Sequence, residues 1–273
     1  MTTCGITNLG SCLVEKFFEF IVNILNMPVS PLLKLINNFM IEPVNINLFA
    51  STWSIIIYIL SLFYGIFLLI VGFKFLISGH SPEKREDAKK NLANIIIMMV
   101  LVQASFFLYA LCLDVVASMT SVIFNLIPSD FFLIATGGMG NIGLDLALLF
   151  PYIFTLLATL IFLALRYICV GVGVIFFAIG IFLYFSGYFK SFGKLILNYL
   201  GVLISLPFIY SIILLASSKF LEINTFSDVK ILVMIGGFGL INLLTMFLLL
   251  FVIVKAANSK PVNQIVTLVK AVA

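Results

Sequence analysis

Long apolar segments alternate with short polar ones along most of this chain, and this pattern predicts its elements. Hydrophobic runs cover residues 52–77, 95–119, 144–189, 195–216 and 231–254. A helix needs about 20 apolar residues to cross a bilayer, so each run is long enough to span one. The run at 144–189 has room for two helices. The pattern therefore predicts five to six hydrophobic segments.

The chain before the first apolar run has an amphipathic pattern. Residues 13–26 mix apolar side chains with charged and amide ones, and they are too few to span a membrane. The segment 27–31 carries two prolines and is expected to end this helix. A second short amphipathic helix would follow and end at Pro43. We expect these amphipathic helices to lie at the membrane interface or to pack on other helices.

Composition agrees with a membrane protein. The 273 residues are 63% hydrophobic and 10% charged, with a mean hydropathy of +1.27, whereas soluble domains are about 25% charged. There is too little polar surface to cover a water-soluble globule. We therefore expect an all-α fold, a polytopic transmembrane helical bundle of the plasma membrane. Its expected divisions are amphipathic N-terminal interfacial helices over 1–48, the bundle over 49–256 and a C-terminal tail over 257–273.

Charge is concentrated in a polar elbow over residues 79–94, between the first two apolar runs. Ser81 can cap the next helix, and Pro82 fits its first turn. Glu86 and Lys90 form an i, i+4 pair in the favourable orientation. The sequence therefore predicts a helical hairpin whose arms enter the membrane and whose elbow lies in the cytoplasm.

The distribution of Lys and Arg bears on the number of crossings. With six crossings and a cytoplasmic elbow, the two sides of the membrane would carry nearly equal numbers of basic residues. If half of the 144–189 run is re-entrant or lies flat, Lys190, Lys194 and the C-terminal tail move to the cytoplasm. The positive-inside rule favours this arrangement of five crossings. The N-terminus would then be extracytoplasmic and the C-terminus cytoplasmic, with six crossings as the alternative.

Residues that could support catalysis or metal binding are few. The chain has one histidine and four cysteines, without the spacing of metal ligands. We therefore expect no enzyme activity, no catalytic or metal site and no cofactor. Four polar residues within apolar runs are candidates for a functional role: Gln103, Asp114, Asp145 and Arg166. Asp114 would reach water or face the bundle interior, and Arg166, between the two helices expected within 144–189, would reach the lipid headgroups.

The elbow carries four cations that form a candidate contact surface: Lys84, Arg85, Lys89 and Lys90. They could contact anionic lipid, a partner ATPase or nucleic acid. The simpler interpretation is that they orient the hairpin and bind headgroups.

Two groups of residues carry a family resemblance. The first is Ser81-Pro82-Glu83-Lys84-Arg85 with Ala88-Lys89. The second is Arg166-Tyr167, Phe182-Leu183-Tyr184, Ser191 and Gly193-Lys194. Over roughly residues 50 to 220, the chain resembles polytopic membrane subunits of conjugation and type IV secretion systems, a group that includes TrbL-like and CedA-like proteins. Ala178 stands where such proteins often carry a proline.

The resemblance implies a channel or platform subunit that helps to pass DNA or protein across the plasma membrane. The partners it implies are membrane lipids, other secretion-machine subunits including a motor ATPase, DNA in transit, and further copies or subunits in a homo- or hetero-oligomer. The alternative is a secondary transporter or small-solute channel built around Asp114, Asp145 and Arg166.

Overall fold

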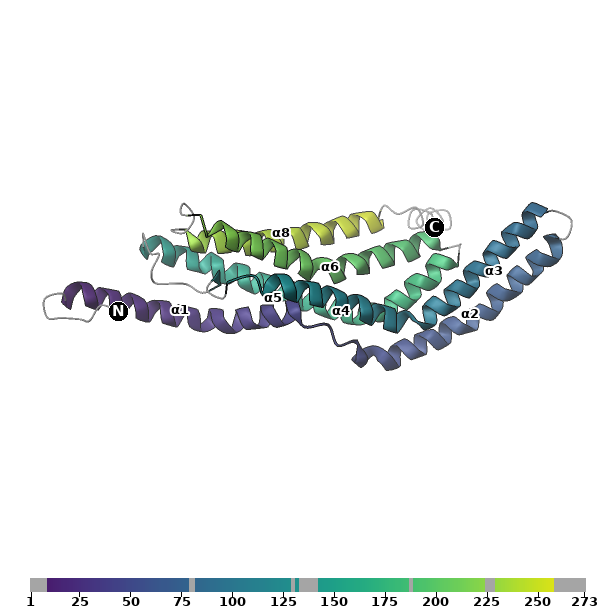
Figure 1. The fold of residues 1–273 in the computed structure, drawn as a ribbon, viewed down its shortest axis with the longest axis horizontal. Coiled ribbons are helices and arrows are strands. Elements are labelled where there is room, and N and C mark those ends of the chain that lie inside the picture. Colours follow the sequence, from purple (N-terminus) through teal and green to yellow (C-terminus); the bar gives the residue numbers. More distant parts are fainter. Residues whose placement is uncertain are drawn as a thin grey trace, which may run out of the picture. The chain divides into compact units, whose positions relative to one another are not determined.

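A computed structural model describes residues 9–78, 82–128, 131–132, 142–186, 189–223 and 229–257. Over these residues the chain forms seven α-helices and one 3-10 helix, without strands (Figure 1). The helices are α1 (Leu9–Ile41), η2 (Ile46–Phe49), α2 (Ala50–Ile77), α3 (Pro82–Gln103), α4 (Ser105–Phe124), α5 (Ile142–Phe185), α6 (Lys190–Phe220) and α8 (Lys230–Ala257). The predicted all-α helical fold is confirmed.

Five helical segments within the described residues are long and apolar enough to cross a membrane. They are Ile46–Ile77, Ser105–Phe124, Leu148–Phe185, Lys190–Phe220 and Lys230–Val252. The protein is therefore a multi-pass membrane protein by the length and composition of its helices. The side on which each terminus lies stays a prediction.

Helix α1 is continuous, so the predicted break at residues 27–31 is wrong. Pro28 and Pro31 both lie inside α1 and are exposed. An internal proline costs a helix about 3 kcal/mol, so another interaction must compensate. Val29, Ile36 and Met40 are almost fully buried, and their spacing places them on one face of the helix. Packing of this face stabilises α1 and compensates for the two prolines within it.

Helix α5 is also continuous, so the predicted division near Arg166 is wrong. It has 44 residues, and at 1.5 Å per residue it is about 66 Å long, roughly twice the thickness of the hydrocarbon core. No proline interrupts it near Arg166, and the helix continues through Ala178. The 144–189 run therefore supplies one candidate span, and the total is five.

The second apolar run is divided at Ala104, where the sequence pattern predicts one span. Backbone hydrogen bonds still connect α3 to α4, from Ala104 N to Val100 O at 2.9 Å and from Leu108 N to Ala104 O at 3.0 Å. At the first residue of α4, Ser105 is fully buried and accepts a 2.9 Å hydrogen bond from Trp53 Nε1. The division therefore coincides with a polar contact to α2.

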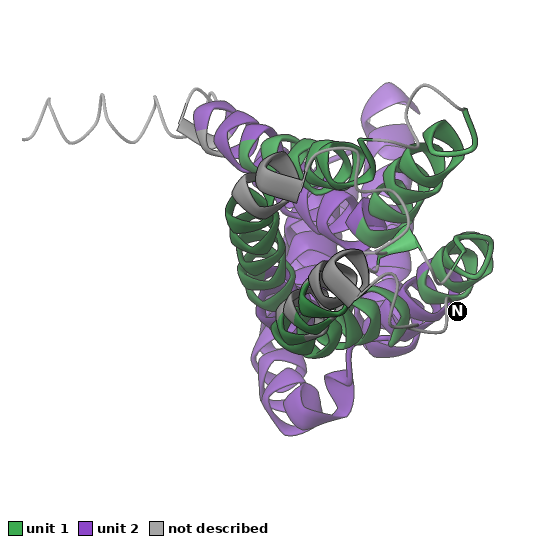
Figure 2. Cartoon of the chain, turned by 90° about the vertical axis from the view of Figure 1, so that its left-hand side faces the viewer, with its two compact units in different colours: residues 1–42, 117–165, 207–246 green, residues 43–116, 166–206, 247–273 purple. Residues whose placement is uncertain are grey.

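The chain forms two compact units (Figure 2). Unit 1 comprises Met1–Glu42, Ala117–Leu165 and Pro207–Met246, and unit 2 comprises Pro43–Val116, Arg166–Leu206 and Phe247–Ala273. The boundaries fall inside α4, α5, α6 and α8, so each of these helices contributes to both units. The predicted division by membrane position uses a different criterion and stays a prediction.

Unit 2 contains the predicted helical hairpin. Helices α2 and α3 lie side by side (Figure 1), and the second half of α5 packs on them. Phe182 of α5 is central, with its ring 5.7 Å from Phe67 and 6.4 Å from Tyr64. The buried core residues are Ile57, Leu60, Tyr64, Val71, Ile95, Met98, Val102, Ala178, Ile181 and Phe182.

Unit 1 has its own core, to which α5, α6 and α8 contribute large side chains. Its fully buried members include Tyr152, Leu156, Leu163, Tyr210, Leu214, Met234, Phe238 and Ile241. The rings of Tyr152 and Phe238 are 6.3 Å apart. Tyrosine is used inside this core because each hydroxyl finds a hydrogen-bond partner, as described below.

Candidate functional site

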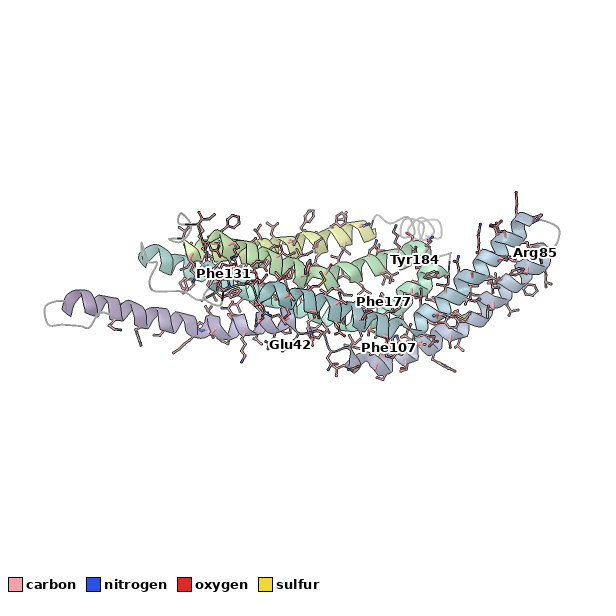
Figure 3. The ribbon with its side chains drawn as sticks, in the orientation of Figure 1. Glu42, Arg85, Phe107, Phe131, Phe177 and Tyr184 are labelled. Carbon is pink, nitrogen blue, oxygen red and sulfur yellow. The ribbon has the colours of Figure 1, made fainter. Side chains whose placement is uncertain are left out.

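The elbow presents its cations on the first turns of α3. Helix α3 begins at Pro82, as predicted, with Glu83 in its first turn. The predicted cap, Ser81, lies outside the described residues. Lys84, Arg85, Lys89 and Lys90 are all exposed. Figure 3 shows Arg85 near the end of the hairpin at which α3 begins.

The predicted Glu86–Lys90 pair is confirmed. Lys90 Nζ lies 3.0 Å from Glu86 Oε1, and about two thirds of each side chain is exposed. The hydrogen bond to Glu86 and the negative charge of that carboxylate raise the pKa of Lys90 above its ordinary value. Lys90 therefore remains a cation at neutral pH. A surface pair of this kind contributes little to stability, so these charges remain accessible to a partner.

The hairpin brings a fifth cation to the elbow, which was not among the four candidate contact residues. Lys74 of α2 lines a surface hollow together with Lys84 and Lys90 of α3. The described lining residues are Lys74, Ile77, Ser78, Lys84, Asp87, Ala88, Lys90 and Asn91. Lys74 lies one turn before the end of α2, so the antiparallel pairing of the arms predicts its place. Three ammonium groups and one carboxylate give this hollow a net positive charge that suits an anionic group.

Arg166 is buried, so the prediction that it reaches the headgroups is wrong. Only 8% of the residue is exposed. Its Nε donates a 2.8 Å hydrogen bond to the carbonyl oxygen of Leu203, and Nη2 donates a 3.3 Å bond to that of Ile204. The guanidinium group of α5 is therefore bonded to the backbone of α6 inside unit 2.

Proline chemistry explains why a carbonyl group of α6 can accept from Arg166. In a regular helix the carbonyl of Leu203 would accept a hydrogen bond from the N–H of residue 207. Residue 207 is a proline inside α6, and it has no N–H to donate. A carbonyl group in an apolar environment needs another donor, and Arg166 supplies it.

A second polar contact lies one helical turn further along α5. The hydroxyl of Tyr109, on α4, donates a 2.6 Å hydrogen bond to the carbonyl oxygen of Val170. Gly173 leaves room for this hydroxyl, because a Cβ atom there would collide with it. Together with Arg166, this contact forms a polar layer in unit 2 that joins α4, α5 and α6.

The other intramembrane candidates differ in their surroundings. Gln103 is exposed at the last residue of α3, and Asp114 is exposed on α4. Asp145 lies on α5, but its side chain is outside the described part of the structure. Of the four candidates, Arg166 is the one that the structure places in a buried polar contact between helices.

Unit 1 holds polar contacts between helices that the sequence interpretation missed. Asn242 Nδ2 donates a 3.0 Å hydrogen bond to the carbonyl oxygen of Thr155, and the hydroxyl of Thr159 lies 3.0 Å from Asn242 Oδ1. The hydroxyls of Tyr210 and Thr245 are 2.5 Å apart. These contacts join α8 to α5 and α6, and a lone Asn in an apolar run is the signal that predicts such a contact.

Comparison with known proteins shows that the hairpin is similar to a secretion family. Residues 45–110 match the family model for the type IV secretion system pilin. The match covers η2, α2, the elbow, α3 and the start of α4, about a quarter of the chain. No curated protein and no solved structure matches the chain. The match supports a component of a type IV secretion system, whose partners are other subunits of that machine.

The described residues carry three candidate spans beyond the matched segment, in α5, α6 and α8. The chain thus combines a hairpin that is similar to this family with further candidate spans. The similarity to secretion components agrees with the resemblance found in the sequence, and the matched segment contains the elbow.

Proposed function

We propose that this chain is a non-enzymatic channel or platform subunit of a type IV secretion or conjugation-like machine, of the TrbL-like or CedA-like kind. It would reside in the plasma membrane and help to pass DNA or protein across it. The observation that carries the proposal is the pilin-like hairpin at 45–110, followed in the same chain by three candidate spans. Because the hairpin and the further candidate spans belong to one chain, the arrangement suits a subunit that stays in the membrane.

The elbow is the proposed contact with the machine. Its exposed cations would lie in the cytoplasm and meet a motor ATPase or DNA in transit, both of which offer anionic groups. Copies of this chain or other subunits would complete the channel. The positive hollow around Lys74, Lys84 and Lys90 supports an anionic partner.

Reversing two elbow charges is expected to reduce transfer. Arg85 and Lys89 are exposed and are not among the described lining residues of the hollow, so R85E/K89E leaves the hollow unchanged. The introduced negative charges would repel an anionic partner and should lower DNA or protein transfer by about tenfold or more. Transfer frequency from cells that carry the variant measures this, with R85K/K89R as the charge-preserving control. Normal transfer by R85E/K89E at normal level and topology would show that Arg85 and Lys89 make no contact that transfer requires.

The five-crossing topology predicts a cytoplasmic Lys190. In a background with all four cysteines replaced by serine, K190C should escape a membrane-impermeant maleimide in intact cells. It should react in inverted membrane vesicles. K16C, on the amphipathic N-terminal helix, should show the opposite pattern. Labelling of K190C from outside in intact cells would exclude the five-crossing arrangement.

A secondary transporter or small-solute channel remains the second candidate, because Arg166 is buried between helices. Ionisable residues inside a membrane bundle commonly mark a substrate path. Asp114 and Asp145 would be the accompanying acids. Solute uptake by the purified protein alone in liposomes, lost in R166M, would favour this function. Uptake that is indistinguishable from that of empty liposomes would rule out the transporter or channel function.

A further inference from the structure

Unit 1 contains a hollow between α1 and the end of α4, separate from the elbow. Its volume is about 420 Å³, in the range of small-ligand sites. The described lining residues come from α1, from the last residue of α4 and from the segment after it: Ser30, Leu33, Lys34, Ile36, Asn37, Phe124, Asn125, Ile127 and Phe132. The hollow is therefore built from described residues of a single compact unit.

The polar groups of the hollow suit an anionic ligand that carries a hydroxyl. Among its described lining residues, Lys34 is the one cation and there is no acid. Asn37 Oδ1 is buried and has no hydrogen-bond partner within the described structure. A buried acceptor without a donor is unfavourable, so a ligand hydroxyl that donates to it would be favoured.

The apolar wall of the hollow is held in place. The rings of Phe124 and Phe132 stack, with centroids 5.7 Å apart and an interplanar angle of 12°. Tyr152 donates a 3.0 Å hydrogen bond to the carbonyl oxygen of Phe132. Phe131, labelled in Figure 3, is only 2% exposed and anchors the same segment. The wall is thus preformed.

The surroundings of the hollow suit a lipid. Leu35 and Leu126, neighbours in sequence of lining residues, are 46% and 62% exposed. Exposed leucines beside a lysine and two amides combine the apolar and polar surfaces that a membrane interface presents. A ligand whose headgroup occupies the hollow could therefore lay its acyl chains on apolar surface nearby.

We propose that this hollow binds an anionic membrane lipid whose headgroup carries a hydroxyl. The phosphate would contact Lys34, and the headgroup hydroxyl would donate to Asn37 Oδ1. The wall of Phe124 and Phe132 would cover the glycerol region. This inference rests on unit 1 alone and does not depend on the proposed role in secretion.

Binding of three lipids distinguishes the proposed contact of the phosphate with Lys34 from that of the headgroup hydroxyl with Asn37. Phosphatidylglycerol offers the anion and the hydroxyl, phosphatidylmethanol offers the anion without a hydroxyl, and phosphatidylcholine is zwitterionic without a hydroxyl. Binding is measured by native mass spectrometry of the purified full chain, in a K84Q/K90Q background that weakens headgroup binding at the elbow. The unmodified hollow should bind phosphatidylglycerol about tenfold more tightly than phosphatidylcholine, with phosphatidylmethanol between them.

Variants of the hollow test each contact. K34Q should remove the preference for phosphatidylmethanol over phosphatidylcholine, because these two lipids both lack the hydroxyl, whereas N37L should remove the preference for phosphatidylglycerol over phosphatidylmethanol. N38L is the matched control, because Asn38 is exposed on the same helix and is not among the lining residues. Equal binding of all three lipids to the unmodified hollow, or unchanged preferences in K34Q and N37L, would overturn the proposal. Circular dichroism confirms that each variant is folded.

Discussion

Replacing Arg166 by leucine is expected to lower the free energy of unfolding by about 2 kcal/mol. The variant loses the hydrogen bonds to the carbonyl oxygens of Leu203 and Ile204 and leaves at least one of them without a donor. The variant also removes the energetic cost of burying the guanidinium charge. This gain offsets part of the loss, which is why the expected value is moderate. Unfolding of the purified protein in detergent, followed by circular dichroism, measures the difference.

Replacing Pro207 by alanine distinguishes the carbonyl contact from a general packing effect. The alanine would restore the backbone N–H that a regular helix directs to Leu203 O. In R166L this N–H should recover about 1 kcal/mol, whereas in the unmodified protein it competes with Arg166 and should add little. An equal effect of P207A in both backgrounds would show that the Leu203 carbonyl is not what links the two residues.

The main features of the fold follow from local patterns in the sequence. Apolar runs longer than a bilayer thickness predicted α2, α6 and α8 within a few residues, because hydrophobic length is a local property. The Glu86–Lys90 pair followed from helical spacing alone. The all-α membrane bundle was therefore predictable without tertiary information.

The errors occurred where packing overrides a local preference. Pro28 and Pro31 are strong helix breakers, yet α1 continues through them because Val29, Ile36 and Met40 bury one face. Arg166 looked like a residue at a helix end, since a charge in an apolar run is costly. Its partners are backbone carbonyls about 40 residues further along the chain, and sequence spacing does not reveal them.

The candidate site was predictable only in part. The four elbow cations were identified because a charged stretch between two apolar runs is conspicuous in sequence. Lys74 joins them through the pairing of α2 with α3, and Asn37 became a candidate because its oxygen is buried without a described partner. The place of Lys74 follows from the predicted hairpin, whereas the burial of the Asn37 oxygen requires three-dimensional contacts.

Replacing Gly193 by alanine is expected to lower the free energy of unfolding by about 2–3 kcal/mol. A Cβ atom at this position of α6 would collide with the backbone nitrogen of Tyr184 and lie 2.6 Å from the carbonyl oxygen of Gly180. Both atoms belong to the backbone of α5, so no side-chain rotation can relieve the contact. The two helices would have to separate, and the α5–α6 packing of unit 2 would be lost.

Gly201 provides the matched control, because it lies in the same helix and a Cβ atom added there would have no neighbouring atom within 4 Å. G201A should leave stability unchanged or raise it by about 0.5–1 kcal/mol, through the better helix propensity of alanine. Detergent unfolding of both variants separates the close approach of α5 and α6 from the intrinsic effect of the substitution. Equal stabilities for G193A and G201A would mean that α6 does not approach α5 closely at Gly193.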